Sequence, residues 1–452
     1  MPNPSTECVR ILVPAGALGL GWDDVALARG VARGPDLIAI DGGSTDSGPA
    51  YLGQGVSKYS RAQIKGDWAV LIDAARKAGC PLVIGTAGTC GAASAVDWLV
   101  GITRDILAET GHRAKIAVLY SDRDPEDLAD RWDRVSPLPG APDVEASALA
   151  DCTNIVALAG VEQVQAALAT GAEIVICGRT TDTAILAALP LARGCHLGGA
   201  WHGAKVGECG AYCCTHPDTG VIEIDFDGRG FTLTPLAETS RATPETVAAH
   251  LLYENADPIR LHEPGGYLDV SGATYRAVGD GSVRVEGSTW VPGPYSVKLE
   301  AARKIGHGIL SLVILRDPRY VVNVADWCAS LEARARDRIR SRMGDVEYDL
   351  QLRRIGVDSA LGDLEPGRAI PNEVGVTAQV IAADEPTARD IAKLVNPLLL
   401  HHPLTPDEPM PTFAFPFSPP ETDMGARYEF VLHHVLALDD PMDGFRLEVL
   451  DA

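Results

Sequence analysis

Residues 37–53, LIAIDGGSTDSGPAYLG, pass directly from an apolar run into a turn that is rich in glycine, hydroxyl and carboxylate side chains. The same change occurs twice more, in VIGTAGTCGAA (residues 83–93) and in VICGRTTDTAI (residues 175–185). In each case a short β-branched run leads into the turn and a segment of helical period follows. Repeated strand–turn–helix units of this kind predict an α/β fold.

The first part of the chain alternates short apolar runs with longer amphipathic segments. The predicted strands are VRILV (9–13), DLIAI (36–40), PLVIG (81–85), KIAVLY (115–120), NIVALA (154–159) and AEIVIC (172–177). Their unbroken apolar character indicates strands that are covered on both faces, as in a parallel sheet between two helix layers. We therefore predict a doubly wound parallel-sheet α/β domain over residues 1–225 that binds the ligand.

The pattern changes after this region. Period-two alternation in residues 220–236 and 273–290 predicts antiparallel strands, so that residues 226–304 form a β-rich insertion or connecting segment. From residue 305 the predicted elements follow in the order βαββαβ, which is typical of a ferredoxin-like α+β domain over residues 305–452. TFAFPFSP (412–419) is the predicted last strand of that unit, and residues 426–441 can add one more.

The charge of the chain restricts its partners. The 61 acidic and 39 basic residues give a formal net charge of -22, which repels phosphate backbones and anionic bilayers, so that neither nucleic acid nor a membrane is expected as a partner. Ten scattered cysteines are typical of buried reduced thiols. The first residues, MPNPSTECVRILVPAG, lack a signal-peptide pattern, and no window approaches 18 uninterrupted apolar residues. We expect a soluble, cytoplasmic protein.

The three polar turns carry the candidate site. Ligands of open parallel sheets bind at the carboxyl ends of the strands, so that the three turns are expected to converge. The candidate catalytic residues are Asp46, Asp182 and Glu208. The candidate substrate-binding residues are Asp41, Gly43, Ser44, Thr45, Ser47, Thr86, Gly88, Thr89, Arg179 and Cys209. Asp41, directly after the strand, is expected to brace the turn, whereas Asp46 lies farther out and is expected to move a proton.

These turns also have structural interpretations. Gly85, Gly88 and Gly91 precede a helix whose backbone N–H groups can face an anion, but a tight strand-to-helix turn also favours glycine. Arg179 can hold a carboxylate or phosphate with two donors, or it can pair with an acidic neighbour within the fold. Asp182 can act as an acid or base, or it can cap the following helix. The sequence leaves these alternatives open.

The segment GECGAYCCTH (207–216) offers a carboxylate, three thiols and a histidine, which are residue types that bind zinc. A zinc site normally has a second pair of ligands at a regular interval, and none follows here. Glu208 as an active-site carboxylate, with Cys213 and Cys214 as packing residues, is the preferred interpretation. We expect no metal.

Several long motifs resemble the acyclic terpene utilisation family, AtuA. They are DGGSTDSGPAYLG (41–53), IGTAGTCGA (84–92), CGRTTDTA (177–184), ECGAYCC (208–214), residues 252–287 beginning LYENADPIRL, YSVKLEAA (295–302) and FAFPFSPPE (413–421). The resemblance covers almost the whole chain. It implies the catabolism of branched acyclic acids, handled as coenzyme A thioesters, without assigning a step. Thr86, Thr89 and Cys90 make one turn more polar than the family pattern, which favours a different substrate.

The first functional hypothesis is an enzyme of the hydratase or dehydratase type, a lyase that acts on a small hydroxy acid or its acyl-CoA thioester. Dehydration needs a base beside a carbonyl group, an acid for the leaving hydroxyl and donors for the enolate oxygen. Asp46 and Asp182 can divide the acid and base roles, Ser44 and Thr45 can donate, and Arg179 can anchor a carboxylate. No cofactor is required, and coenzyme A enters only as part of the substrate.

Two alternatives remain. The chain can be a metabolite-binding or scaffolding subunit of a catabolic complex, although a simple binder of anions would avoid paired carboxylates. Acyl or phosphoryl transfer would need a nucleophile beside a base, or a lysine with bound Mg²⁺, and Lys298 and Asp269 stand in no recognisable arrangement for this. The ligand is expected to be a small anionic metabolite or acyl-CoA. A homo-oligomer is expected from fold analogy alone.

Overall fold

A computed structural model describes residues 8–253, 255–279, 281–366 and 370–452. The chain divides into two compact units. The first consists of Met1–Arg303 together with Phe430–Ala452, and the second of Lys304–Glu429. The segments 1–225 and 226–304, which the sequence analysis separates, therefore both belong to the first unit, except for Lys304. The last 23 residues of the chain, assigned above to the third segment, also belong to the first unit.

The helices and strands of the described residues have the following bounds. The helices are α1 (Asp24–Ala32), α2 (Ala50–Gln54), α3 (Arg61–Ala78), α4 (Ala93–Thr110), α5 (Pro125–Asp130), α6 (Val161–Ala169), α7 (Ala184–Ala192), α8 (Leu197–Gly207), α9 (Pro244–Ala249), α10 (Pro318–Val322), α11 (Val324–Met343) and α12 (Glu385–His401). The strands are β1 (Val9–Val13), β2 (Leu37–Asp41), β3 (Leu82–Gly85), β4 (Lys115–Tyr120), β5 (Val135–Pro137), β6 (Cys152–Ala157), β7 (Ile174–Cys177), β8 (Ile222–Phe226), β9 (Gly230–Pro235), β10 (Arg260–Glu263), β11 (Gly266–Asp269), β12 (Thr274–Val278), β13 (Ser282–Glu286), β14 (Thr289–Pro292), β15 (Ser296–Leu315), β16 (Tyr348–Ile355), β17 (Val374–Ala382), β18 (Glu421–Ala437) and β19 (Arg446–Asp451).

A ten-stranded mixed sheet forms the centre of the first unit. Its strand order is β12-β13-β9-β8-β1-β2-β3-β7-β4-β19, and the neighbours from β1 to β4 pair in parallel. Both faces of these strands are covered. Ile38 and Ile40 pack in a core with residues of α1, α3 and α4, whereas Leu37 and Ala39 pack in a core with residues of α6, α7 and α8. The predicted α/β architecture with a parallel sheet between two helix layers is thus observed.

The predicted strand at residues 154–159 does not belong to this sheet. β6 pairs in antiparallel fashion with residues 299–303 of β15 instead. The prediction of a parallel strand here was wrong because an apolar run identifies a buried strand but not its neighbour. The period-two regions are antiparallel as predicted, with the hairpins β8–β9 and β12–β13. They extend the large sheet beside β1, while β10, β11 and β14 form a separate three-stranded sheet.

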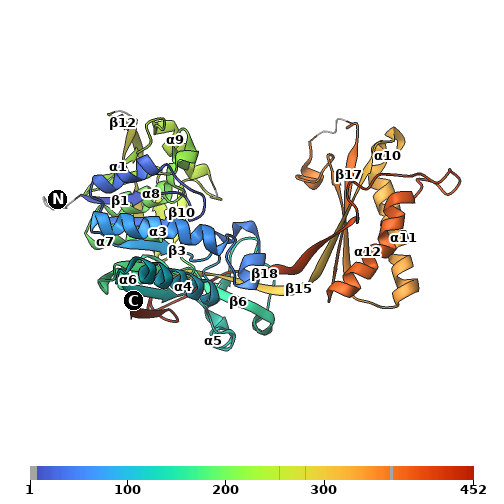
Figure 1. Ribbon diagram of the computed structural model, residues 1–452, viewed down its shortest axis with the longest axis horizontal. Helices are drawn as coiled ribbons and strands as arrows, with labels where there is room; N and C mark the ends of the chain where they lie inside the picture. Colours follow the sequence, from blue (N-terminus) through green and yellow to red (C-terminus); the bar gives the residue numbers. More distant parts are fainter. Residues whose placement is uncertain (1–7, 254, 280, 367–369) are drawn as a thin grey trace. The chain divides into compact units, whose positions relative to one another are not determined.

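The second unit has the element order β15-α11-β16-β17-α12-β18, with the short helix α10 between β15 and α11. Figure 1 shows α11 and α12 side by side against its sheet. The order βαββαβ agrees with the sequence, but the last strand does not. TFAFPFSP (412–419) makes only an isolated bridge between Ala414 and Ile314, and β18 takes the final position. Pro416 and Pro419 lack the N–H groups that a continuous strand would need.

The three polar turns converge, as the sequence predicts. They follow the neighbouring strands β2, β3 and β7, and backbone hydrogen bonds connect them directly. The Gly42 N–H donates to the Gly85 carbonyl (2.8 Å), the Thr86 N–H donates to the Gly178 carbonyl (2.9 Å), and the Arg179 N–H donates to the Gly91 carbonyl (3.2 Å). The backbone of all three turns is therefore one hydrogen-bonded assembly.

Gly91 is required by this assembly. Its φ is +65°, and a Cβ atom there would lie 2.2 Å from the Arg179 backbone nitrogen. We expect Gly91→Ala to cost about 1–3 kcal/mol of stability through overpacking, with further strain from the left-handed backbone. Gly101→Ala in α4 is the matched control, because no atom lies within 4 Å of a Cβ there. Thermal unfolding should show a lower midpoint for Gly91→Ala alone; equal midpoints would contradict the packing role.

Candidate active site

A cavity of about 230 Å³ lies where the first and third turns meet the end of α8. It belongs entirely to the first unit. Its walls are Gly16, Ala17, Leu20, Asp41, Gly43, Ser44, Asp46, Ser47, Lys58, Tyr59, Thr89, Asp182, Glu208, Cys209, Tyr212 and Tyr253. Four carboxyl groups thus face a small space in which Lys58 is the only basic side chain among the described lining residues.

Asp41 ends β2 and is buried. Its Oδ2 accepts a hydrogen bond from the Gly43 N–H (3.1 Å), while its Oδ1 has no hydrogen-bond partner among the described residues. Burial raises the pKa of Asp41 well above its usual value, and the nearby Asp182 raises it further. A positive φ of +126° at Gly43 aims this N–H back at the carboxylate. Asp41 therefore braces the turn with one oxygen and faces the cavity with the other.

A second group of charges surrounds Lys205, which lies near the end of α8. The Lys205 ammonium contacts the Glu208 carboxylate, and both side chains are largely buried. Burial lowers the pKa of Lys205, but Glu208, Glu263 and Asp182 outweigh this effect and raise it, so that Lys205 remains charged. Burial raises the pKa of Glu208 to about 8 despite Lys205, with further contributions from Asp182 and Glu263. One ammonium cannot compensate three buried carboxylates, and the raised pKa favours the neutral, protonated form of Glu208.

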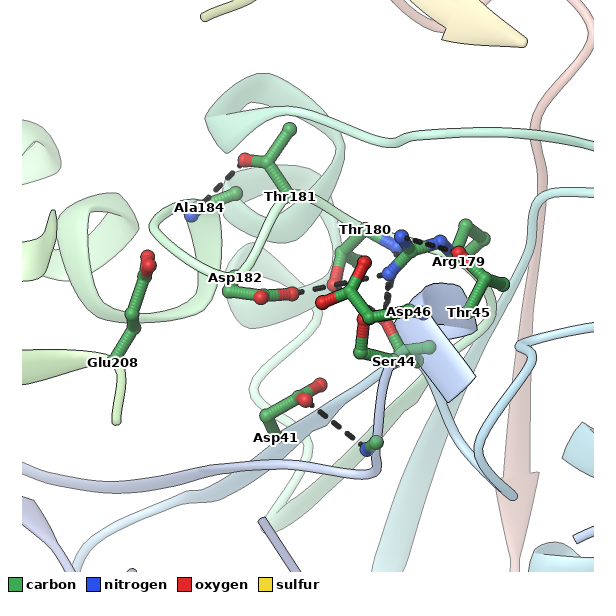
Figure 2. A network of polar contacts seen from close by, with 12 residues as sticks. Asp41, Ser44, Thr45, Asp46, Arg179, Thr180, Thr181, Asp182, Ala184 and Glu208 are labelled. Atoms are coloured by element: carbon green, nitrogen blue, oxygen red, sulfur yellow. Dashed lines mark hydrogen bonds and ion pairs between the residues drawn. The ribbon is translucent and has the colours of Figure 1, made fainter. Parts of the chain in front are cut away.

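Asp182 lies between Arg179 and the group of charges around Lys205. Figure 2 shows its carboxylate pointing toward Arg179, with Glu208 on the other side. Its nearest oxygen is 3.9 Å from the Arg179 Nη1. Burial raises the pKa of Asp182, Arg179 and Lys205 oppose this effect, and Asp46 adds to it. The N-cap residue of α7 is Thr183 rather than Asp182.

Arg179 is buried behind the cavity and does not line it. Its Nε donates to the Glu300 Oε2 (3.0 Å), and its Nη2 lies 3.4 Å from the Glu300 Oε1. The remaining donors reach the hydroxyl groups of Thr86 (3.2 Å) and Thr45 (3.2 Å), so that Arg179 joins all three turns. Lys298 also donates to Glu300 (2.9 Å). These contacts correspond to the structural interpretation of Arg179, as an ion pair within the fold.

The structure brings most of the candidate residues together. The cavity is lined by Asp41, Gly43, Ser44, Asp46, Ser47, Thr89, Asp182, Glu208 and Cys209. Thr45, Thr86 and Arg179 lie in the buried network behind it. Gly88 lies away from the cavity, with a φ of +63° and Ala95 so close that a Cβ would be 2.8 Å from its Cβ. The glycine at this position is therefore explained by helix packing.

Sequence reasoning missed the charged partners Lys205, Glu263 and Glu300, and the cavity residues Lys58 and Tyr253. Lys205 and Glu208 have the i,i+3 spacing of neighbours on a helix, which is a usable signal. Glu300 and Tyr253 lie within motifs that support the family resemblance, YSVKLEAA and LYENADPIRL. For Lys58 and Glu263 no local pattern stands out.

The cysteine-rich segment packs as a turn. Cys213 and Cys214 are buried, with their sulfur atoms 3.8 Å apart. Among the described residues, the only group whose ligand atoms all lie within 4.8 Å of one another is His307, Glu385 and Asp423 of the second unit. Residues 207–216 do not form such a group.

A family model described as acyclic terpene utilisation family protein AtuA matches residues 57–412. The chain belongs to this family. The prediction from sequence motifs is therefore confirmed, although the motifs at 41–53 and 413–421 lie outside the matched residues. Neither a curated protein nor a solved structure gives a match. In the part of the chain that is described, no helix has the length and apolar character needed to span a bilayer.

The ion pair behind the cavity predicts a strong stability effect. Glu300→Gln removes the carboxylate that is hydrogen-bonded to the buried Arg179, which should cost about 3–5 kcal/mol at pH 7. The pKa of Glu300 is lowered to about 2, because Arg179 and Lys298 outweigh the opposing effect of burial. The stabilisation by the ionised form is therefore present above about pH 4.5 and is lost as the pH falls toward 2. Denaturant unfolding at several pH values should show that the difference in unfolding free energy between the wild type and Glu300→Gln becomes smaller in acid. The control variant Glu126→Gln, at an exposed position, should show no loss of unfolding free energy.

The raised pKa of Glu208 predicts the opposite pH dependence, a stability of the wild-type protein that falls as the pH rises. Its carboxyl is neutral in the folded state up to about pH 8, but ionises near pH 4.5 when unfolded. The wild-type protein should lose up to about 1.4 kcal/mol of stability per pH unit over this window. Glu208→Gln cannot ionise, and its stability relative to the wild type should therefore rise between pH 5 and pH 9. Denaturant unfolding measures this, and a constant difference would contradict the neutral carboxyl.

Proposed function

We propose that the protein is a lyase of the hydratase or dehydratase type, acting on a small hydroxy acid or its acyl thioester. One observation carries the proposal. Glu208 and Asp182, whose pKa values are both raised by burial, face the same cavity as the exposed carboxyl group of Asp46. Neighbouring carboxyl groups in different environments can take the separate acid and base roles that elimination of water requires.

In the proposed elimination, Asp46 at the open side of the cavity removes the proton from the carbon beside the carbonyl group. Glu208 donates a proton to the hydroxyl group on the next carbon, the C–O bond breaks and water leaves, so that a carbon–carbon double bond forms. Addition of water is the reverse sequence. Asp182 lies between Glu208 and Arg179. Its charge raises the pKa of Glu208 and so favours the protonated form of this acid.

Substrate contacts come from the same lining. The hydroxyl groups of Ser44 and Ser47 face the cavity and can donate to a carbonyl oxygen that gains negative charge. Arg179, the anchor suggested by the sequence, is already bonded to Glu300, Thr45 and Thr86. In our proposal Lys58 binds the substrate carboxylate in its place. Coenzyme A, where the substrate carries it, is part of the substrate, and no other cofactor is invoked.

The competing classes have weaker support. A receptor for anions gains nothing from four carboxyl groups around a cavity of about 230 Å³. For group transfer, Lys298 is paired with Glu300, and the Asp269 Oδ1 accepts from the Ser271 N–H (2.8 Å), so that neither is placed as a nucleophile with a base. The family description links the chain to acyclic terpene utilisation, which is compatible with a hydratase step in a degradation pathway.

The proposal predicts the behaviour of three variants. Asp46→Asn and Glu208→Gln should each lower turnover by about 10²–10⁴-fold, because proton transfer by a positioned side chain contributes that much. Asp182→Asn should also lower turnover, because Asp182 raises the pKa of the acid Glu208. Turnover is measured with a panel of hydroxy acids, unsaturated acids and their thioesters, by absorbance of the conjugated double bond. Asp24→Asn and Glu126→Gln, on exposed helix positions, are matched controls. Full activity in all three cavity variants on an identified substrate would refute the assignment.

A further inference from the structure

The first unit contains a second, larger cavity that the proposed reaction does not use. Its volume is about 540 Å³, and it lies against the three-stranded sheet β10-β11-β14. The walls are mainly apolar and include Leu138, Leu158, Pro264, Tyr267, Pro294 and Val435. It shares no lining residue with the smaller cavity. Its size is within the range of about 300–1,000 Å³ that is usual for small-molecule sites.

The polar side chains of the lining are Thr181, His262, Glu263, Ser296 and Lys298. The Lys298 side chain is 36% exposed, and its ammonium lies 2.9 Å from the buried Glu300 carboxylate. That carboxylate also pairs with Arg179, and Arg179 lies in addition 3.9 Å from the Asp182 carboxylate, so that two cations face two carboxylates. Burial raises the pKa of Glu263, which favours its neutral form. The Lys298 ammonium is partly exposed in this apolar chamber, and one of its three donors goes to Glu300. The chamber is therefore complementary to an apolar chain that ends in a single negative charge.

We propose that this cavity binds an amphiphilic monocarboxylate, with its chain against Leu158 and Val435 and its carboxylate at Lys298. A neutral ligand would give the Lys298 ammonium a weaker, uncharged hydrogen bond. A phosphate dianion would need several donors to replace its water, and apolar walls do not supply them. The site is separate from the proposed lyase cavity, and its occupancy does not depend on the reaction assigned there.

Octanoate, octan-1-ol and octylammonium test this site, with binding to the full-length chain measured by calorimetry. Octanoate should bind most tightly. Lys298→Met, which keeps most of the apolar stem, should weaken octanoate binding about tenfold and leave octan-1-ol binding unchanged. Val435→Trp should abolish the binding of both by filling the chamber. Lys77→Met and Val25→Trp are the matched controls, at an exposed ion pair and on the exposed face of α1.

Three outcomes would overturn the proposal. The first is octanoate binding that is equally tight in Val435→Trp, which would place the ligand elsewhere. The second is octanoate binding that is unaffected by Lys298→Met, or matched by octylammonium, which would remove the carboxylate assignment. The third is no binding of octanoate at millimolar concentration. Activity of the Asp182→Asn and Glu208→Gln variants tests the lyase separately, so that one proposal can fail without the other.

Discussion

The buried ion pair between Arg179 and Glu300 is the interaction on which the candidate site depends. An uncompensated guanidinium in the interior is strongly unfavourable, so the position of Arg179 fixes the position of every group that satisfies it. Those groups are Thr45 after β2, Thr86 after β3 and Glu300 on β15. Arg179 thereby connects the ends of three parallel strands to one antiparallel strand. This network therefore fixes the backbone around the cavity and with it the shape of the cavity.

The same network explains why the carboxyl groups in front of it behave as acids. Arg179 directs its hydrogen bonds to Glu300 and lies 3.9 Å from Asp182, so that only part of its charge compensates the cavity. Lys205 is shared among Glu208, Glu263 and Asp182. The number of buried carboxyl groups therefore exceeds the number of cations beside them, and the low dielectric of the interior makes full ionisation costly. Retained protons are the expected result, and they are what elimination of water uses.

Much of this arrangement could be predicted from the sequence, because it follows from local patterns and sheet geometry. Apolar runs identified β2, β3 and β7, and the carboxyl ends of neighbouring parallel strands must lie at one edge, so that Asp41, Thr86 and Arg179 were expected to meet. The partner of Arg179 could not be predicted in this way. Glu300 is 121 residues away, on an antiparallel strand, and side-chain pairing at that separation leaves no periodic signal.

Glu300 also connects the two cavities of the first unit. Its Oε2 accepts from Thr45 and Arg179 on the side of the polar turns. Its Oε1 accepts from Lys298, which faces the apolar chamber, and lies 3.4 Å from the Arg179 Nη2. Charges in this interior are screened far less than charges in water. A negative charge beside Lys298 would therefore attract this ammonium away from Glu300, and Glu300 would depend more strongly on Arg179 for its compensation. Arg179 is also the nearest cation in this network to Asp182. The two cavities share no lining residue, yet a cation beside each of them pairs with the same carboxylate.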